Sequence, residues 1–184
     1  MSNAQLTPVS YVVLGLVSQG ATTPYDMKQK AAASVGYFWN FPHSQLYAEP
    51  ARLAGLGLLA EEREDGGRRR RVYTLTSAGR EALDAWLREP TREQTQIRDT
   101  GLLKLFFGEG LNADEVAELA RAQEEVHRAR LAVYEAAATD VEQPNHSAVV
   151  RAGLLHERTF AEFWSELAAT PPSPSSPDSA AGRR

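Results

Sequence analysis

The spacing of hydrophobic residues predicts three helices in the first third of the chain. The first apolar stripe follows Thr7–Pro8, a pair suited to the N-cap and first turn of a helix, and it ends near Gly20. Thr23–Pro24 gives the same signal for a second helix, which we expect to end at about Ser34. The third helix ends at Gly57 and carries three apolar residues at helical spacing: Leu46, Leu53 and Leu56.

Pro50 leaves the start of the third helix undecided. If Ser44 is the N-cap, the proline lies inside the helix, where it removes a backbone hydrogen bond and clashes with the preceding turn. The helix therefore either begins late, around Glu49–Pro50, or has a distorted first turn. The sequence alone leaves both alternatives open.

A hairpin is predicted directly after the third helix. Two short runs of strand-like composition are joined by Asp65–Gly66–Gly67, which is a tight-turn signal, and four consecutive arginines leave this turn. Thr76 or Ser77 then caps a fourth helix, expected from Ala78 to about Arg88. A helix followed by an arginine-tipped hairpin is typical of a winged helix-turn-helix.

The second half of the chain predicts three more helices after a polar linker at 89–100. A short apolar helix ends at Gly108, the longest helix runs from Asn112 to about Ala138, and the last is expected from about Ser147 to Ala168. Apolar and alanine side chains recur every seven residues along the longest helix and form a seam suited to close helix–helix approach. With aromatic residues of the last helix, this seam makes the predicted dimer interface: Leu119, Ala122, Val126, Ala129, Val133, Phe160, Phe163 and Trp164.

The predicted elements give a mainly α (α+β) fold with two domains. An N-terminal winged helix-turn-helix is expected at 1–90, followed by a C-terminal helical dimerisation domain at 91–169. Residues 170–184 are rich in proline, serine and alanine, a composition typical of a disordered tail.

Composition restricts the function classes further. The net charge of −4 divides unevenly, because residues 1–88 hold 10 Lys and Arg against 8 Asp and Glu, whereas residues 89–184 hold 10 against 16. The basic excess therefore lies in the half that contains the hairpin. The chain has no cysteine, which excludes disulfides and Cys-based zinc sites. It has neither a secretory signal nor an apolar run of the roughly 20 residues that span a membrane, so we expect a cytoplasmic protein without membrane partners.

Short polar and aromatic groups gather where a recognition helix would reach base edges. The candidates for base contact are His43, Ser44, Gln45 and Tyr47. Arg52 is placed to face phosphate. Wing contacts to the backbone or minor groove are expected from Arg68, Arg69, Arg70 and Arg71. The alternative is that these arginines form a solvated hairpin edge opposite four acidic residues: Glu61, Glu62, Glu64 and Asp65.

Signals for enzymatic or metal chemistry are weak. The GxGxxA pattern that starts at Gly55 ends a helix and precedes a strand, the reverse of a dinucleotide site. The four histidines lack metal-site spacing, and His156 is expected to be buried on an apolar face. We therefore predict no enzyme, no cofactor and no metal. Trp39 and Phe41 lie between helices and could line a cavity for a small aromatic effector. Pro50 and the acidic C-terminal half leave room for an alternative function, a sensor of aromatic or phenolic compounds whose DNA binding is lost or secondary.

The assembled motifs resemble the PadR family of transcriptional regulators. The signature over the first 88 residues runs from Phe38–Trp39 and Ser44–Gln45–Leu46–Tyr47 to Arg52–Leu53, Gly57–Leu58, Gly66–Gly67–Arg68, Val72–Tyr73–Thr74–Leu75–Thr76 and Gly79–Arg80–Glu81–Ala82–Leu83. The second half resembles the C-terminal domain of the virulence-activator-alpha branch through Leu103–Lys104–Leu105–Phe106–Phe107–Gly108, Arg151–Ala152–Gly153–Leu154 and Glu157–Arg158. One departure is Ala48, where the family usually has the proline that this chain places at Pro50.

The resemblance implies a dimeric bacterial regulator whose C-terminal helices pair across a two-fold axis. We therefore expect a homodimer that binds double-stranded DNA sequence-specifically and regulates transcription, as a repressor. Two-fold symmetry predicts a roughly palindromic operator.

Overall fold

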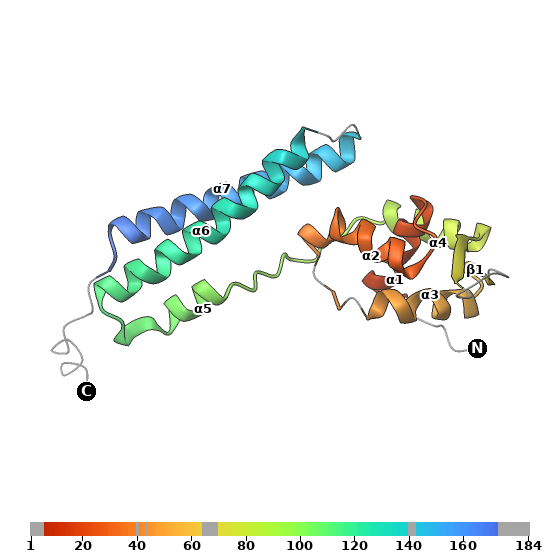
Figure 1. Ribbon diagram of the computed structural model, residues 1–184, viewed down its shortest axis with the longest axis horizontal. Helices are drawn as coiled ribbons and strands as arrows, with labels where there is room; N and C mark the ends of the chain where they lie inside the picture. Colours follow the sequence, from red (N-terminus) through yellow and green to blue (C-terminus); the bar gives the residue numbers. More distant parts are fainter. Residues whose placement is uncertain (1–5, 40, 43, 64–69, 140–142, 173–184) are drawn as a thin grey trace. The chain divides into compact units, whose positions relative to one another are not determined.

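A computed structural model describes residues 6–39, 41–42, 44–63, 70–139 and 143–172 of the 184-residue chain. The chain divides into two compact units, Met1–Gln94 and Thr95–Arg184. Figure 1 shows helices and a short hairpin in the first unit and helices in the second. The mainly helical fold with a small two-stranded sheet, expected from the sequence, is confirmed.

The first two helices begin where their sequence signals predict. Helices α1 (Pro8–Ser18) and α2 (Pro24–Ala32) each start with a capping box, in which Thr7 or Thr23 caps the helix and the residue three places on returns the bond. Helix α1 ends at Gly20, whose φ of 90° suits glycine and lets the chain turn sharply toward α2. Helix α2 ends two residues before the predicted Ser34.

Helix α3 (Gln45–Gly55) follows a short 3-10 turn, η1 (Val35–Tyr37). Gly57 ends it with a φ of 74°. The amide of Leu58 donates to the carbonyl of Leu53, and the amide of Gly57 donates to that of Ala54, both at 3.0 Å. This pair of bonds is a Schellman motif, which satisfies the last carbonyls of the helix and directs the chain into the hairpin.

The hairpin consists of β1 (Leu59–Arg63) and β2 (Arg71–Leu75), paired antiparallel with Glu61 opposite Tyr73 and Arg63 opposite Arg71. The amide of Tyr73 also donates to the carbonyl of Thr22 at 2.8 Å, so that β2 is bonded to the α1–α2 turn as well as to β1. Helix α4 (Ser77–Arg88) completes the unit, and its N-cap is Thr76.

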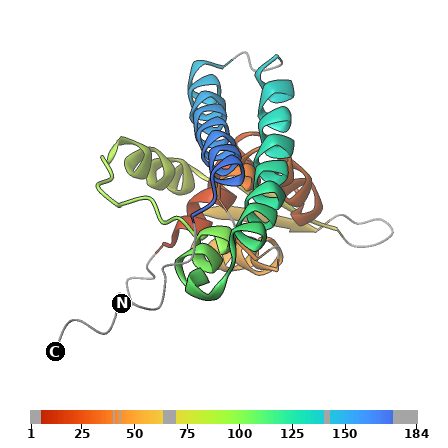
Figure 2. The same ribbon diagram turned by 90° about the vertical axis from the view of Figure 1, so that its left-hand side faces the viewer.

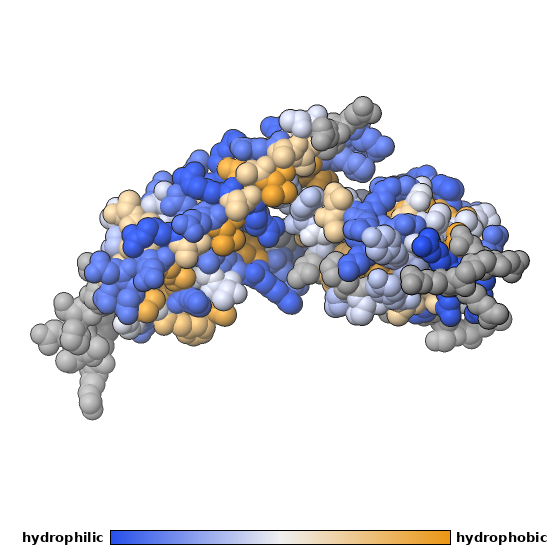
Figure 3. All heavy atoms as spheres, in the orientation of Figure 1, coloured by the Kyte–Doolittle hydropathy of each residue, from blue (hydrophilic) through white to orange (hydrophobic). Residues whose placement is uncertain are grey.

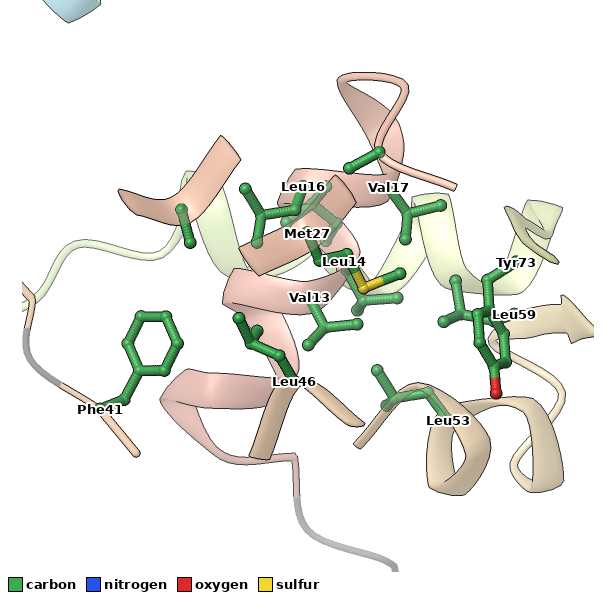
Figure 4. Close-up of a cluster of buried hydrophobic side chains, with 13 residues drawn as sticks. Val13, Leu14, Leu16, Val17, Met27, Phe41, Leu46, Leu53, Leu59 and Tyr73 are labelled. Carbon is green, nitrogen blue, oxygen red and sulfur yellow. The ribbon is translucent and has the colours of Figure 1, made fainter. Parts of the chain in front are cut away.

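A single hydrophobic core joins the helices of this unit to the hairpin. Figure 4 shows side chains of α3 and of both strands converging on α1. The buried members are Val13, Leu14, Leu16, Val17, Ala21, Met27, Ala31, Phe41, Leu46, Leu53, Leu59, Tyr73 and Leu83. Because these residues come from every element of the unit except η1, the positions of α3 and the hairpin depend on the same core.

The second unit is built on a long helical hairpin. Helices α6 (Ala113–Ala138) and α7 (Pro144–Ala169) lie side by side in both views (Figures 1 and 2). The ring of Tyr134 packs directly on Gly153, where an added Cβ would lie 2.3 Å from a ring carbon. Two short elements precede the hairpin, α5 (Thr100–Phe106) and η2 (Gly108–Gly110). No helix in the described ranges is long and apolar enough to cross a bilayer.

Several sequence-based details differ in this unit. Helix α7 begins at Pro144 rather than near Ser147, because proline occupies its first position. Helix α5 begins at Thr100, capped by Asp99, so the predicted linker at 89–100 ends earlier than expected. The prediction for His156 was wrong: its side chain is exposed, whereas that of His127 on the facing helix is buried.

Gly79 provides a test of how closely α4 packs on the hairpin. A Cβ at this position would lie 2.0 Å from the carbonyl oxygen of Leu58, a backbone atom that cannot move without displacing β1. We expect Gly79→Ala to lower the free energy of unfolding by about 3 kcal/mol, at the upper end of overpacking costs, as measured by urea denaturation.

Gly15→Ala is the matched control. Gly15 lies inside α1, and a Cβ there would meet nothing within 4 Å. Because alanine favours a helix interior over glycine, this change should stabilise the unit by roughly 0.5–1 kcal/mol. Equal stability of the two variants would contradict the packing of α4 described above.

Candidate nucleic-acid interface

Helix α3 presents a polar and small-residue face to solvent because its apolar face is fixed in the core. Leu46, Pro50 and Leu53 are buried at i, i+4 and i+7. Gln45 and Tyr47 are exposed on the flanks. The face opposite the core carries small side chains at helical spacing: Ser44, Ala48, Ala51 and Gly55. Such a face allows close approach to a partner surface, with longer side chains on either side.

The structure decides where α3 begins. The helix starts at Gln45, not around Glu49–Pro50, and Pro50 lies inside it with its ring buried. Proline has no N–H, so it cannot donate to the carbonyl of Leu46. Ser44 precedes the helix in an α-helical conformation, and its hydroxyl makes no capping bond. His43, the remaining candidate at this end, lies outside the described residues.

A polar cluster ties α3 to α1 and engages Arg52. The guanidinium of Arg52 donates to both carboxylate oxygens of Glu49, at 2.6 and 2.9 Å. Ser10, which is fully buried on α1, donates to Glu49 at 2.6 Å and accepts from Arg52 at 3.0 Å. These bonds fix the side chain of Glu49 between the two helices.

Charge in this cluster is largely balanced. The hydrogen bonds from Arg52, with those from Ser10, hold the pKa of Glu49 below its ordinary value. The guanidinium of Arg52 is about two-fifths exposed, and Glu49 already neutralises it in part. Its predicted contact to phosphate would therefore compete with Glu49. Glu49 was not among the candidate residues, although its i, i+3 spacing from Arg52 was the available signal.

The base of the hairpin concentrates arginines around one carboxylate. The guanidinium nitrogens of Arg63 and Arg71 each lie 3.6 Å from Glu61, and the hydroxyl of Tyr73 donates to the same carboxylate at 3.1 Å. Burial raises the pKa of Tyr73, which keeps this hydroxyl protonated. Arg70 is exposed immediately before β2.

The described arginines show features of both interpretations of the arginine run, the DNA-contacting wing and the solvated hairpin edge. Arg71 pairs with Glu61, as the solvated-edge alternative expects, while Arg70 and Arg71 both remain exposed at the start of β2. Arg68 and Arg69 lie outside the described residues. The described part of the hairpin keeps a basic excess, with three arginines and two glutamates.

Phe41 and Trp39 do not share an environment. Phe41 is buried in the hydrophobic core. Trp39 is exposed, next to the exposed ring of Phe38. No three His, Asp or Glu side chains in the described parts of the chain are grouped as a metal site would require.

The predicted dimer seam lies on the surface of the second unit. Val126 is 50% exposed and Val133 is 43% exposed, with Ala122 and Ala129 also exposed between them and Leu119 half-buried. Figure 3 shows apolar groups scattered among polar ones over this unit.

The aromatic members of the predicted interface differ in their exposure. Phe163 is exposed and Phe160 is half-buried. The prediction for Trp164 was wrong, because its indole is fully buried within one protomer and has no surface to offer a partner. Three further apolar residues near the start of this unit are exposed: Leu103, Phe106 and Phe107.

Comparison with known proteins finds a matching family model for each of the two units. Residues 13–85 match the transcriptional regulator PadR-like family, and residues 97–170 match the family described as virulence activator alpha C-term. The first unit therefore contains a PadR-like region, and the second a virulence activator alpha C-terminal region. The resemblance inferred from the sequence is thereby confirmed in both halves.

Relatives match over most of the chain. The negative transcriptional regulator PadR of Bacillus subtilis (strain 168) is 29% identical over 125 residues, which cover 67% of this chain and 69% of that protein. The crystal structure of Bacillus subtilis PadR in complex with operator DNA superposes with a TM-score of 0.78 at 25% identity, covering 89% of this chain and 98% of that one. The Vibrio cholerae virulence activator AphA gives a TM-score of 0.67 at 27% identity, covering 88% and 96%.

The pH dependence of Glu49→Gln tests the α1–α3 cluster. Because the pKa of Glu49 is lowered in the folded state, its contribution to stability is present above the unfolded-state pKa and is lost as the pH falls through the folded-state value. At pH 7 we expect the variant to lose about 1–2 kcal/mol of unfolding free energy, as for a charge-assisted hydrogen bond. The difference from wild type should shrink progressively as the pH falls below the ordinary glutamate pKa of about 4.3, in urea titrations at each pH.

Glu62→Gln is the control, because Glu62 is an exposed glutamate on β1. It should leave the unfolding free energy within about 0.5 kcal/mol of wild type. A Glu49→Gln deficit that persists unchanged at pH 3 would show that the loss comes from packing and not from the ion pair.

Proposed function

We propose that the protein is a sequence-specific DNA-binding regulator that acts as a homodimer on a roughly palindromic operator. The observation that carries this is the outward face of α3, which combines small residues with Gln45 and Tyr47 and is followed by an arginine-bearing hairpin. The similarity to Bacillus subtilis PadR, crystallised with operator DNA, supports the same use of this surface. In each protomer α3 would enter a major groove while the hairpin contacts backbone or minor groove.

The chemistry of α3 fits base readout. Gln45 can donate to and accept from an adenine edge simultaneously, and the hydroxyl of Ser44, which makes no capping bond, can pair with any base. Ala48 and Ala51 offer methyl groups that suit contact with the thymine methyl. Base contacts would specify the site, and guanidinium contacts from the hairpin would add affinity without sequence preference.

Dimerisation would set the spacing of the two half-sites. The exposed seam of α6 buries little within the protomer, and pairing it with a second copy would remove Val126 and Val133 from water. A two-fold axis through this seam places two copies of α3 in symmetric positions. The half-sites should then lie one helical turn of DNA, about 34 Å, or a small multiple apart.

We infer repression as the regulatory effect. The Bacillus relative that matches over two thirds of the chain is named a negative regulator. The Vibrio cholerae relative is named an activator, which shows that one architecture serves both directions. The position of the operator relative to the promoter, and not the DNA-binding surface itself, would then decide the sign.

Selection of bound sequences from random DNA tests the proposal. The full-length protein should enrich an inverted repeat, and Arg70→Ala/Arg71→Ala should bind this site more weakly with a shallower salt dependence. Removing one arginine–phosphate interaction reduces the slope of log K against log salt by about 0.9. The double variant should therefore flatten the slope by up to about 2, measured by fluorescence anisotropy between 50 and 300 mM salt.

Arg128→Ala is the control for loss of positive charge, because Arg128 lies on α6 and pairs with Glu124. Its operator affinity and salt slope should equal those of wild type. No enriched sequence in the selection would exclude sequence-specific binding, and an unchanged slope in the hairpin variant would exclude the hairpin as a phosphate contact.

Charged substitutions in the α6 seam test the dimer. Val126→Glu/Val133→Glu should produce a monomer in sedimentation equilibrium, since pairing would bury two like charges on each copy. Operator affinity should fall at least tenfold, because the half-sites would be bound independently.

Leu87→Glu is the matched control, an equally drastic change at an exposed leucine of α4 in the other unit. It should sediment as wild type does. If the seam variant remains dimeric, the dimer interface lies elsewhere. The exposed rings of Phe106 and Phe107 are then the next surface to test.

A further inference from the structure

A buried polar cluster lies inside the helical unit. Glu157 of α7 is 2% exposed and His127 of α6 is 8% exposed. The Nδ1 of His127 is 2.7 Å from one carboxylate oxygen of Glu157, and the Nε of Arg130 donates to the other at 2.8 Å. Neither the DNA-binding surface nor the dimer seam requires this arrangement.

The second ring nitrogen of His127 faces another carboxylate. Its Nε2 lies 3.8 Å from the Oδ2 of Asp99, an ion-pair distance, and the Asp99 side chain is largely buried. The other oxygen of Asp99 accepts the amide of Leu102 at 3.0 Å and thereby caps α5. One imidazole thus lies between the N-cap of α5 and the middle of α7.

The start of α5 is also docked sterically on α6. Gly101 is buried, and a Cβ there would lie 2.6 Å from the side chain of Gln123. Gln123 is one helical turn before His127, so both contacts lie on one face of α6. The first turn of α5 is therefore held in two ways: Gly101 packs closely on Gln123, and Asp99 lies at ion-pair distance from His127.

The contacts of the two ring nitrogens bear on the protonation state of the imidazole. The 2.7 Å contact with Glu157 requires a proton between the two atoms and lies in the range of charge-assisted bonds. A neutral ring with its proton on Nδ1 would turn the lone pair of Nε2 toward the carboxylate of Asp99. An imidazolium faces both carboxylates with N–H groups, and with Arg130 it balances the two negative charges.

We propose that His127 is an imidazolium that clasps the start of α5 to the α6–α7 hairpin, and that pH controls this clasp. The charged and titratable groups around the ring are Glu157 and His156 from α7, Asp99 from the start of α5 and Arg130 from α6 itself. Loss of the proton leaves a net negative charge in a dehydrated site, which is relieved when Asp99 turns to solvent. The cap of α5 is lost with it, together with the anchor for the chain that precedes Asp99.

Hydrogen exchange of the α5 amides in the full-length protein tests the clasp. Protection of Leu102 and Leu103, corrected for the intrinsic pH dependence of exchange, should fall about tenfold or more between pH 6 and pH 8.5. His127→Gln should give low protection at both pH values. The matched control His156→Gln changes the neighbouring exposed histidine, whose ring lies tilted against that of Phe160, and should keep the wild-type response.

A second variant separates the clasp from folding. Asp99→Asn removes the charge but retains a good N-cap, so α5 should stay protected at pH 6 and lose its response to pH. In nitrogen-15 spectra, both ring nitrogens of His127 should carry protons at pH 6. A pH response retained in Asp99→Asn, or a neutral His127 ring at pH 6 with α5 fully protected, would overturn the proposal. These measurements concern the helical unit alone, so their failure is distinguishable from a failure to bind DNA.

Discussion

The burial of one face of α3 against α1 is the constraint on which the proposed function depends. Leu46 and Leu53 are fully buried in the same core as Val13 and Leu14. Removing such side chains from water stabilises the unit by roughly 1.5–3 kcal/mol each, far more than any surface contact of the helix. The core therefore decides which way α3 faces, and the polar residues on its other side become available as a consequence.

The order of elements and most of their ends could be predicted from local signals. The capping residues Thr7, Thr23 and Thr76 and the glycines at positions 20 and 57 act through backbone geometry that the neighbouring residues fully determine. The start of α3 could not be predicted in this way, because Pro50 lies inside the helix with its ring buried. Burial of a side chain depends on the elements that pack around it and is invisible in the local sequence.

Side-chain environments were predicted less well than helices. Trp164 and His156 both lie on α7, and the apolar pattern of this helix did not decide which of its sides would be buried. Their burial depends on which element packs against them, and this is decided by the tertiary fold. The Glu49–Arg52 pair shows the same limit at the candidate site: the spacing was visible, but Ser10 is 39 residues away from Glu49 and completes the cluster.

The bond between Tyr73 and Thr22 gives the hairpin a second attachment. Since β2 is bonded to the α1–α2 turn as well as to β1, the hairpin cannot tilt without carrying that turn along. The α1–α2 turn therefore restrains the orientation of the hairpin. A change in the length of this turn would therefore shift β2 and, with it, the arginines at the start of that strand.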